Sequence, residues 1–145
     1  MSTQKWMDCY VYMQDNGSGN VRGWEEDPGP QGYWKITQIE STDKYLLSPM
    51  KWPNWYMYIQ DNSDGNIRGW KGDPGPQGHW MITQKGTVIV NGQSVPTYVF
   101  STCKWPDWYM YMQDNYAGNV RGCKGDPGIQ GYFIMNEVQL YPGEQ

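Results

Sequence analysis

Residues 52–83 read WPNWYMYIQDNSDGNIRGWKGDPGPQGHWMIT, and close copies of this 32-residue block begin at Trp6 and Trp105. Successive copies therefore start 46 and 53 residues apart. A repeat of this length cannot bury its apolar face alone, so neighbouring copies must share a core. We expect one domain of residues 1–145, with repeats at about 1–50, 51–103 and 104–145.

Each block has the residue pattern of β-strands. Met57 and Ile59 alternate with Tyr58 and Gln60, which gives one apolar face and one amphipathic face. Two polar turns follow, Asn-x-x-Gly-Asn and Asp-Pro-Gly-Pro-Gln-Gly, because proline fixes φ and glycine permits positive φ. No stretch has a helical apolar period of helix length, so the chain is predicted to be all-β.

Further strands are expected after the second turn and in the connectors. The strand after the turn should place Trp34 and Ile36 of the first copy inward. The second connector should form a hairpin that turns at Asn91-Gly92. The connectors contain the remaining strand candidates, 44–50, 96–103 and 138–141.

Three copies of about four strands favour a β-trefoil, which has twelve strands in three units. Gly65-Asn66-Ile67-Arg68, followed by Pro-Gly-Pro-Gln-Gly and an aromatic residue, resembles the repeat of fascin-like trefoils. Gln77-Gly78-His79-Trp80 is similar to the Gln-x-Trp motif of ricin-B-type lectins, with one residue more. The resemblance implies either a sugar-binding or a protein-binding trefoil.

A three-fold β-prism is the alternative fold. Met13-Gln14-Asp15-Asn16 followed by Gly19-Asn20-Val21 resembles the Gln-x-Asp-x-Asn-x-Val-x-Tyr strand of bulb-type mannose lectins. Two residues are inserted, however, and Gly23 stands where that motif ends in tyrosine. The repeat is also too long for this family.

Charge and composition exclude several classes of protein. A net charge of −4 argues against a main partner that is nucleic acid or an anionic membrane surface. No apolar run reaches the roughly 18–20 residues of a membrane span, and the start lacks the apolar region of a secretory signal. The odd cysteine count fits free thiols, so we expect a cytoplasmic protein or one secreted without a leader peptide.

Catalytic and metal-binding groups are scarce. The one histidine, His79, is replaced by tyrosine in the other copies, which is typical of a surface substitution. Cys9 and Cys123 stand where other copies have tryptophan, so they are expected to be small buried apolar residues. Asp61-Asn62-Ser63-Asp64-Gly65 resembles a calcium loop, but no copy has the closing glutamate. We expect no enzyme activity, no cofactor and no metal.

The strongest functional signal is a polar set that recurs in all three copies. The chain has only three arginines, and all occupy one repeat position. On the short strand the arginine, asparagine and tryptophan should share the face opposite Val21. A sugar could stack on the tryptophan while the polar groups bond its hydroxyls. The candidate ligand-binding residues are Asp15, Asn16, Asn20, Arg22, Trp24, Asp61, Asn62, Asn66, Arg68, Trp70, Asp114, Asn115, Asn119 and Arg121.

The same residues could instead have structural roles. Asp and Asn at turn starts cap their own backbone, and the arginine could lock the Asp-Pro-Gly turn through a bidentate ion pair. We favour a lectin with up to three equivalent glycan sites. The alternatives are a fascin-like protein-interaction module and, lower, the targeting subunit of a membrane-lesion toxin. Exposed Trp and Tyr would also suit a homodimer.

Overall fold

The computed structural model describes residues 1–115 and 118–137, and in this part the chain forms twelve strands and three single-turn 3-10 helices. The first repeat contains β1 (Ser2–Thr3), β2 (Tyr10–Met13), β3 (Val21–Trp24) and β4 (Trp34–Gln38). The second contains β5 (Tyr45–Pro49), β6 (Trp55–Ile59), β7 (Ile67–Lys71) and β8 (Trp80–Val90). The third contains β9 (Gln93–Thr102), β10 (Trp108–Met112), β11 (Val120–Lys124) and β12 (Phe133–Ile134).

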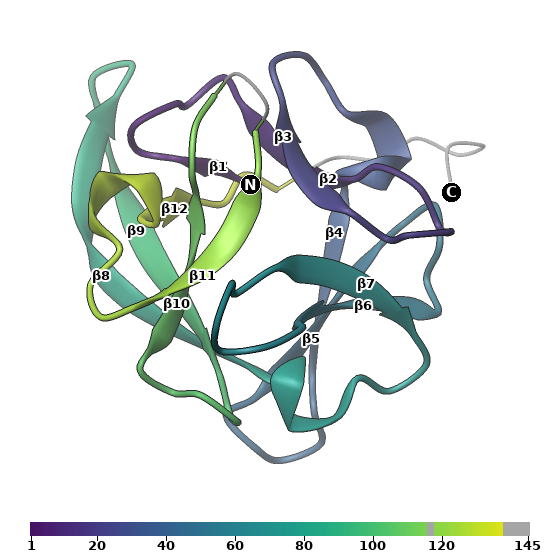
Figure 1. Ribbon diagram of the computed structural model, residues 1–145. Helices are drawn as coiled ribbons and strands as arrows, with labels where there is room; N and C mark the ends of the chain where they lie inside the picture. Colours follow the sequence, from purple (N-terminus) through teal and green to yellow (C-terminus); the bar gives the residue numbers. More distant parts are fainter. Residues whose placement is uncertain (116–117, 138–145) are drawn as a thin grey trace.

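These strands form a barrel and a cap. Antiparallel pairing joins β1, β12, β9, β8, β5 and β4 in that order, while β2–β3, β6–β7 and β10–β11 form three hairpins. Single residue pairs connect β2 to β1 and β10 to β9, whereas β6–β7 forms its own two-stranded sheet. Figure 1 shows the three hairpins grouped around the middle of the molecule. A barrel closed at one end by three hairpins is a β-trefoil, so this prediction is confirmed and the prism alternative is not adopted.

The core fills the space between the barrel and the cap. Alternate residues of the hairpins are completely buried, among them Met57 and Ile59, and the barrel adds an aromatic cluster around Phe100. Phe100 packs edge-on against Trp80 and Phe133, with ring centroids 6.5 and 5.5 Å apart. The period-two pattern of the repeats therefore selects the buried face of each hairpin.

The cap is held together at backbone level. The backbone N–H of Gly69 donates to the carbonyl of Gly19, that of Gly122 to Gly65, and that of Gly23 to Gly118. Each N···O distance is 2.7 Å. A Cβ on Gly19, whose φ is +68°, would lie 2.7 Å from the Gly69 carbonyl oxygen. Only glycine allows the hairpins to approach this closely, which explains its recurrence at this repeat position.

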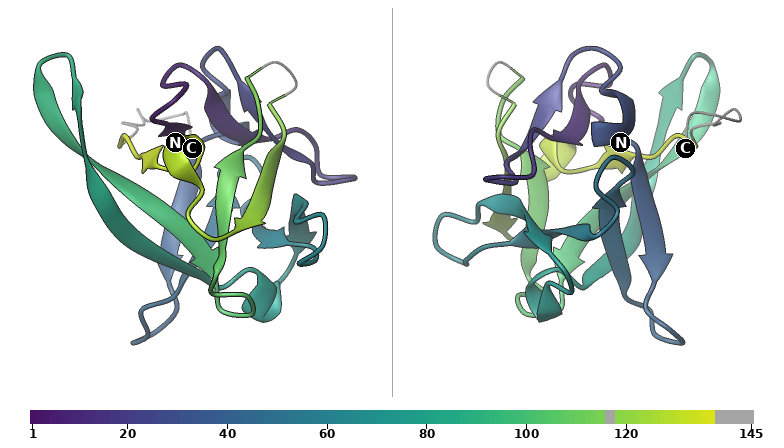
Figure 2. Two further views of the ribbon diagram at one scale, coloured as in Figure 1. Left: turned by 60° about the vertical axis from the view of Figure 1, so that its left-hand side comes forward. Right: turned by 90° about the vertical axis from the view of Figure 1, so that its right-hand side faces the viewer.

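The remaining predicted turns and strands have mixed outcomes. Asn91 and Gly92 both have positive φ, as expected for a tight hairpin turn, and the long β8–β9 hairpin extends beyond the barrel (Figure 2). The connector candidates 44–50 and 96–103 correspond to β5 and β9, whereas 138–141 lies outside the described residues.

The expectation that Ile36 points into the core was wrong, because this residue is 39% exposed. Among the described residues, no backbone pairing joins β4 to β1.

Candidate functional site

The hairpin aspartates hold their own loops. Oδ1 of Asp61 accepts hydrogen bonds from the backbone N–H groups of Ser63, Asp64 and Gly65, at 2.8–3.1 Å. Asp15 makes the same contacts in the first hairpin, and Asp114 accepts a bond from Gly118. The backbone donors, first that of Gly65, lower the pKa of Asp61 below its ordinary value. For these three predicted site residues, the geometry matches the structural interpretation.

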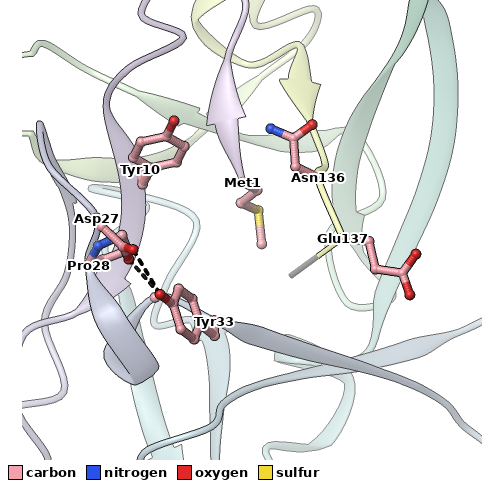
Figure 3. A pocket seen from close by; sticks show the side chains of 8 residues that line it. Met1, Tyr10, Asp27, Pro28, Tyr33, Asn136 and Glu137 are labelled. Carbon is pink, nitrogen blue, oxygen red and sulfur yellow. Dashed lines mark hydrogen bonds between the residues drawn. The ribbon is translucent and has the colours of Figure 1, made fainter. Parts of the chain in front are cut away.

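A second aspartate fixes each Asp-Pro-Gly turn without help from arginine. Oδ1 of Asp27 accepts a bond from Gly29 N–H at 2.9 Å, and the Tyr33 hydroxyl donates to the same carboxylate at 2.7 Å (Figure 3). In the second copy, His79 Nε2 lies 2.9 Å from Asp73 Oδ1, so His79 substitutes for the tyrosine. The hypothesis that arginine locks this turn was wrong, because no described ion pair contains an arginine.

The repeated asparagines and arginines converge instead on one pocket. Asn20 of the first hairpin forms a backbone bridge with Arg68 of the second, and the corresponding bridges join Asn66 to Arg121 and Asn119 to Arg22. The three bridges surround the pseudo-three-fold axis and close the cap. A pocket of about 220 Å³ lies there, lined by Asn20, Val21, Arg22, Asn66, Ile67, Arg68, Asn119, Val120 and Arg121. The sequence grouped the asparagines and arginines as a repeated set but did not show that they line one pocket.

The exposed tryptophans lie apart from this axial pocket. Trp24 and Trp70 are 48% and 52% exposed. Each packs on a tyrosine of the same hairpin: the ring centroids of Tyr12 and Trp24 are 5.9 Å apart, and those of Tyr58 and Trp70 are 5.8 Å apart. Burial raises the pKa of Tyr58, and the nearby Arg68 partly opposes this rise. Trp24 with Tyr12, and Trp70 with Tyr58, therefore each form an aromatic pair at the surface, and we call each pair an aromatic plate.

Each aromatic plate borders a small cleft. Trp24 and Tyr12 line a cleft of about 290 Å³ together with Asp27, Pro28 and Gln31. The second-copy cleft is about 270 Å³, and its lining includes Trp70 and Tyr58 with Gln60, Arg68 and Lys71. Arg68 therefore borders both this cleft and the axial pocket. The third hairpin has Cys123 at the tryptophan position and offers far less apolar surface.

The exposed asparagines complete the predicted set. Asn16, Asn62 and Asn115 are exposed in the hairpin loops and line neither the axial pocket nor the tryptophan clefts described above. Their repetition follows the loop sequence that each aspartate caps.

Sequence reasoning missed a third repeated group. Lys5, Lys51 and Lys104 lie over the rings of Trp6, Trp52 and Trp105, with Nζ 4.9–5.1 Å from the ring centroids. The signal was a Lys-Trp pair in front of each block. Since lysine covers one face of each ring, these tryptophans are less suited to stacking than Trp24 and Trp70.

Sequence reasoning also missed a cavity of about 390 Å³ that lies between the first repeat and the end of the third. It is lined by Met1, Tyr10, Asp27, Pro28, Gly32, Tyr33, Asn136 and Glu137 (Figure 3). The β1–β4 edge of the barrel lies beside it, and an adjoining cavity of about 570 Å³ includes the exposed Ile36. Met1, Asn136 and Glu137 lie far in sequence from the repeated turn that supplies Asp27 and Tyr33, so only the fold reveals this cavity.

The cysteines are free thiols in the described residues. Burial, with a smaller contribution from the nearby carboxylates Glu25, Asp8 and Asp114, raises the pKa of Cys9 to about 11. Burial also raises the pKa of Cys103 and Cys123. A raised pKa keeps a thiol protonated at neutral pH, so these groups are poor nucleophiles.

Two further kinds of feature are absent from the described part of the chain. There, no cluster of three His, Cys, Asp or Glu residues could hold a metal ion. Nor does this part contain a helix long and apolar enough to cross a membrane.

Comparison with curated proteins finds local similarity to jellyfish toxins. Toxin CfTX-B of Chironex fleckeri is 49% identical over 37 residues, which is 26% of this chain and 8% of the toxin. Toxin CaTX-A of Carybdea alata is 50% identical over 36 residues, again 8% of the toxin. The matched length is close to that of one repeat block. No family model matches the chain.

Comparison with solved structures shows the fold over nearly the whole chain. A mosquitocidal holotoxin matches with a TM-score of 0.80 and 14% identity, covering 95% of this chain and 17% of the toxin. Polyporus squamosus lectin, bound to a sialylated glycan, matches with a TM-score of 0.63 and 16% identity, covering 88% of this chain and 44% of the lectin. An endo-β-galactosidase from Clostridium perfringens matches with a TM-score of 0.65 and 13% identity, covering 93% of this chain and 31% of the enzyme. At these identities the matches establish a shared all-β architecture.

Proposed function

We propose that the chain is a non-enzymatic carbohydrate-binding module whose glycan sites are the clefts beside Trp24 and Trp70. The observation that carries this proposal is a contact that recurs at one position of two hairpins. In each, an exposed tryptophan packs against a half-buried tyrosine. An exposed aromatic ring offers a large, flat apolar surface to a ligand. The C–H face of a pyranose is a suitable contact, because it is flat and apolar.

The polar residues of the second cleft suit the rest of such a ligand. Arg68 and Lys71 supply charged donors, and Gln60 supplies an amide. These groups would bond sugar hydroxyls while the ring stacks on Trp70. A rigid plate with a few placed polar groups is the usual composition of a small-ligand site.

The third repeat should bind weakly or not at all. Cys123 replaces the tryptophan, so the stacking surface is missing there. We therefore propose two working sites in place of the three equivalent sites that the repeat alone predicts. Two sites on one rigid body would add avidity on a surface that carries many glycans, provided that both can engage at once.

A second candidate function is supported by the comparisons. Both the curated relatives and one solved neighbour are toxins, and each is much longer than the region matched. The chain would then be the recognition part of a toxin, with glycans as its receptors. This candidate uses the same clefts and differs only in what the bound surface is for.

A glycan array tests the sugar-binding proposal. The wild-type chain should bind a defined subset of glycans, and the double variant W24A/W70A should lose binding while it keeps its melting temperature. Trp70→Phe serves as the matched variant, because it keeps an aromatic plate and should keep part of the signal. Silence of the wild type across neutral, sulfated and sialylated glycans would contradict the proposal.

A further inference from the structure

The axial pocket has a composition unlike that of any other described cavity. Three arginines, one from each hairpin, line this pocket of about 220 Å³ together with three asparagines. They lie on the face of the cap opposite the buried Val21, Ile67 and Val120. Because the three hairpins are joined by equivalent backbone bridges, the polar groups surround one axis.

The arginines are not neutralised by the protein. Although the chain has fifteen acidic residues and a net charge of −4, no ion pair in the described residues contains an arginine. The hairpin aspartates, the nearest repeated carboxylates in sequence, bond their own loops instead. The three positive charges of the chain's only arginines therefore face a common space without a counter-charge.

One buried donor is also unsatisfied. The Nε of Arg121 is buried and has no hydrogen-bond partner among the described residues. A buried donor without a partner carries a desolvation penalty that a ligand at the right place removes. Within the described residues, the protein supplies no acceptor to this guanidinium nitrogen.

We propose that the axial pocket binds one tetrahedral oxyanion, the sulfate or phosphate group of a monoester. Three oxygens of such a group are related by a three-fold axis, as are the three arginines. Guanidinium groups donate to oxyanions with charge-assisted and often bidentate hydrogen bonds, and the asparagine amides add neutral donors. The fourth, ester oxygen would lie on the axis and connect to the rest of the ligand outside the pocket.

This site is separate from the proposed glycan clefts, although Arg68 borders both the pocket and the Trp70 cleft. Arg22 and Arg121 line the axial pocket and neither of the two tryptophan clefts. Arg121 lies on the hairpin that has no exposed tryptophan, so its substitution tests the anion site apart from the clefts. Arg22 lies opposite Tyr12 in the strand pairing and is therefore the less clean of the two positions.

Calorimetric titration with inorganic sulfate and with phosphate, against sodium chloride at equal ionic strength, tests the proposal. One anion should bind per chain, and R22A or R121A should each weaken binding by about ten- to a hundredfold. Lys35→Ala removes one exposed positive charge from β4 and serves as the control, with unchanged affinity. Binding of three anions per chain, equal effects of R22A and K35A, or no binding of either anion would overturn the proposal.

A thermal measurement keeps the test decisive if an arginine variant folds poorly. A ligand that binds only the folded state raises the melting temperature as its concentration rises. At low millimolar concentration, where the general stabilising effect of sulfate is small, sulfate should therefore stabilise the wild type and W24A/W70A equally, and chloride should not. Loss of the sulfate effect in W24A/W70A would place the anion at the tryptophan clefts and overturn the axial assignment.

The chemical source of the anion is resolved by two monoesters. Galactose 6-sulfate and glycerol 3-phosphate should compete with inorganic sulfate for the same single site. The tighter competitor identifies whether the group comes from a sulfated sugar or a phosphorylated molecule. Failure of both to displace sulfate would contradict a monoester ligand.

Discussion

Arg68 of the second hairpin lies directly opposite Asn20 of the first, in a backbone bridge that recurs between the other two hairpin pairs. The repeated Asn and Arg are therefore neighbours across repeats, and each hairpin contributes its pair to two joints of the cap. This arrangement fixes where both repeated residues lie in the cap. It also brings three separate sequence motifs to one pocket on the axis.

The Asp-Pro-Gly turn should depend on its aspartate and not on the repeated arginine. Asp73→Ala removes the bonds to Gly75 N–H and His79, so we expect the free energy of unfolding to fall by about 1–2 kcal/mol. Arg68→Ala should leave the melting temperature nearly unchanged, because Arg68 has no ion pair in the described residues. Thermal unfolding of both variants checks this, and a larger loss in R68A than in D73A would contradict it.

Close contact between the hairpins should make Gly19 far more sensitive than Gly29. Both residues have positive φ, +68° and +64°, but only Gly19 faces the backbone of a neighbouring hairpin. Gly29→Ala should cost about 1–2 kcal/mol for its backbone conformation alone. Gly19→Ala should cost clearly more, because a Cβ there would collide with Gly69 and separate the two hairpins. Chemical denaturation of the pair provides the comparison, and equal losses would show that the joint is not rigid.

Acid should destabilise the protein through its turn aspartates. Hydrogen bonds from backbone N–H groups lower the folded-state pKa of Asp61, Asp73 and Asp126 below the ordinary 3.8. A lowered pKa means that the stabilisation is fully present above the unfolded-state value and is lost as the pH falls through the folded-state value. We expect a nearly flat contribution above about pH 5 and a decline below about pH 4.

The variant Asp61→Asn isolates one of these groups. Its amide oxygen can still accept a backbone bond, but it cannot titrate. Melting temperatures measured from pH 2.5 to 6 should therefore fall less steeply in D61N than in the wild type. Parallel curves for the two proteins would show that Asp61 does not contribute to the loss of stability in acid.

How far the sequence predicts this molecule differs between fold and site. The period-two pattern at Met57 and Ile59, and the Asn91-Gly92 turn, are local signals, and both predicted their structures correctly. The partners of Arg68 were not predictable, because a pseudo-three-fold axis relates residues some fifty positions apart. Ile36 failed for a related reason: its burial depended on a barrel neighbour that β4 lacks in the described residues.

The surroundings of Trp24 and Trp70 were also only partly predictable from the sequence. Alternation placed them correctly on the outer face, two residues after the arginine. It could not show that each would stand on a tyrosine of the paired strand, at a ring distance under 6 Å. Cross-strand register decides that contact, and register depends on the hairpin as a whole.

Removal of one aromatic plate should weaken sugar binding without unfolding the chain. Burial of a large apolar side chain against a ligand contributes about 1.5–3 kcal/mol, so Trp70→Ala should reduce affinity at its cleft about ten- to a hundredfold. Trp52→Ala is the comparison, since Lys51 already covers one face of that ring. Calorimetric titration of both variants with a glycan that the wild type binds measures the difference, and a greater loss in W52A would move the site away from Trp70.

The central claim, that glycans stack on Trp24 and Trp70, is tested most directly by the nine indole N–H signals of a 15N-labelled chain. Galactose, mannose and their N-acetyl derivatives are titrated separately at millimolar concentration, with each signal assigned by single substitution. The account predicts saturable shifts at Trp24 and Trp70 with at least one of these sugars, while the buried Trp80 stays still. No shift with any of them, or shifts confined to Trp6, Trp52 and Trp105, would contradict it.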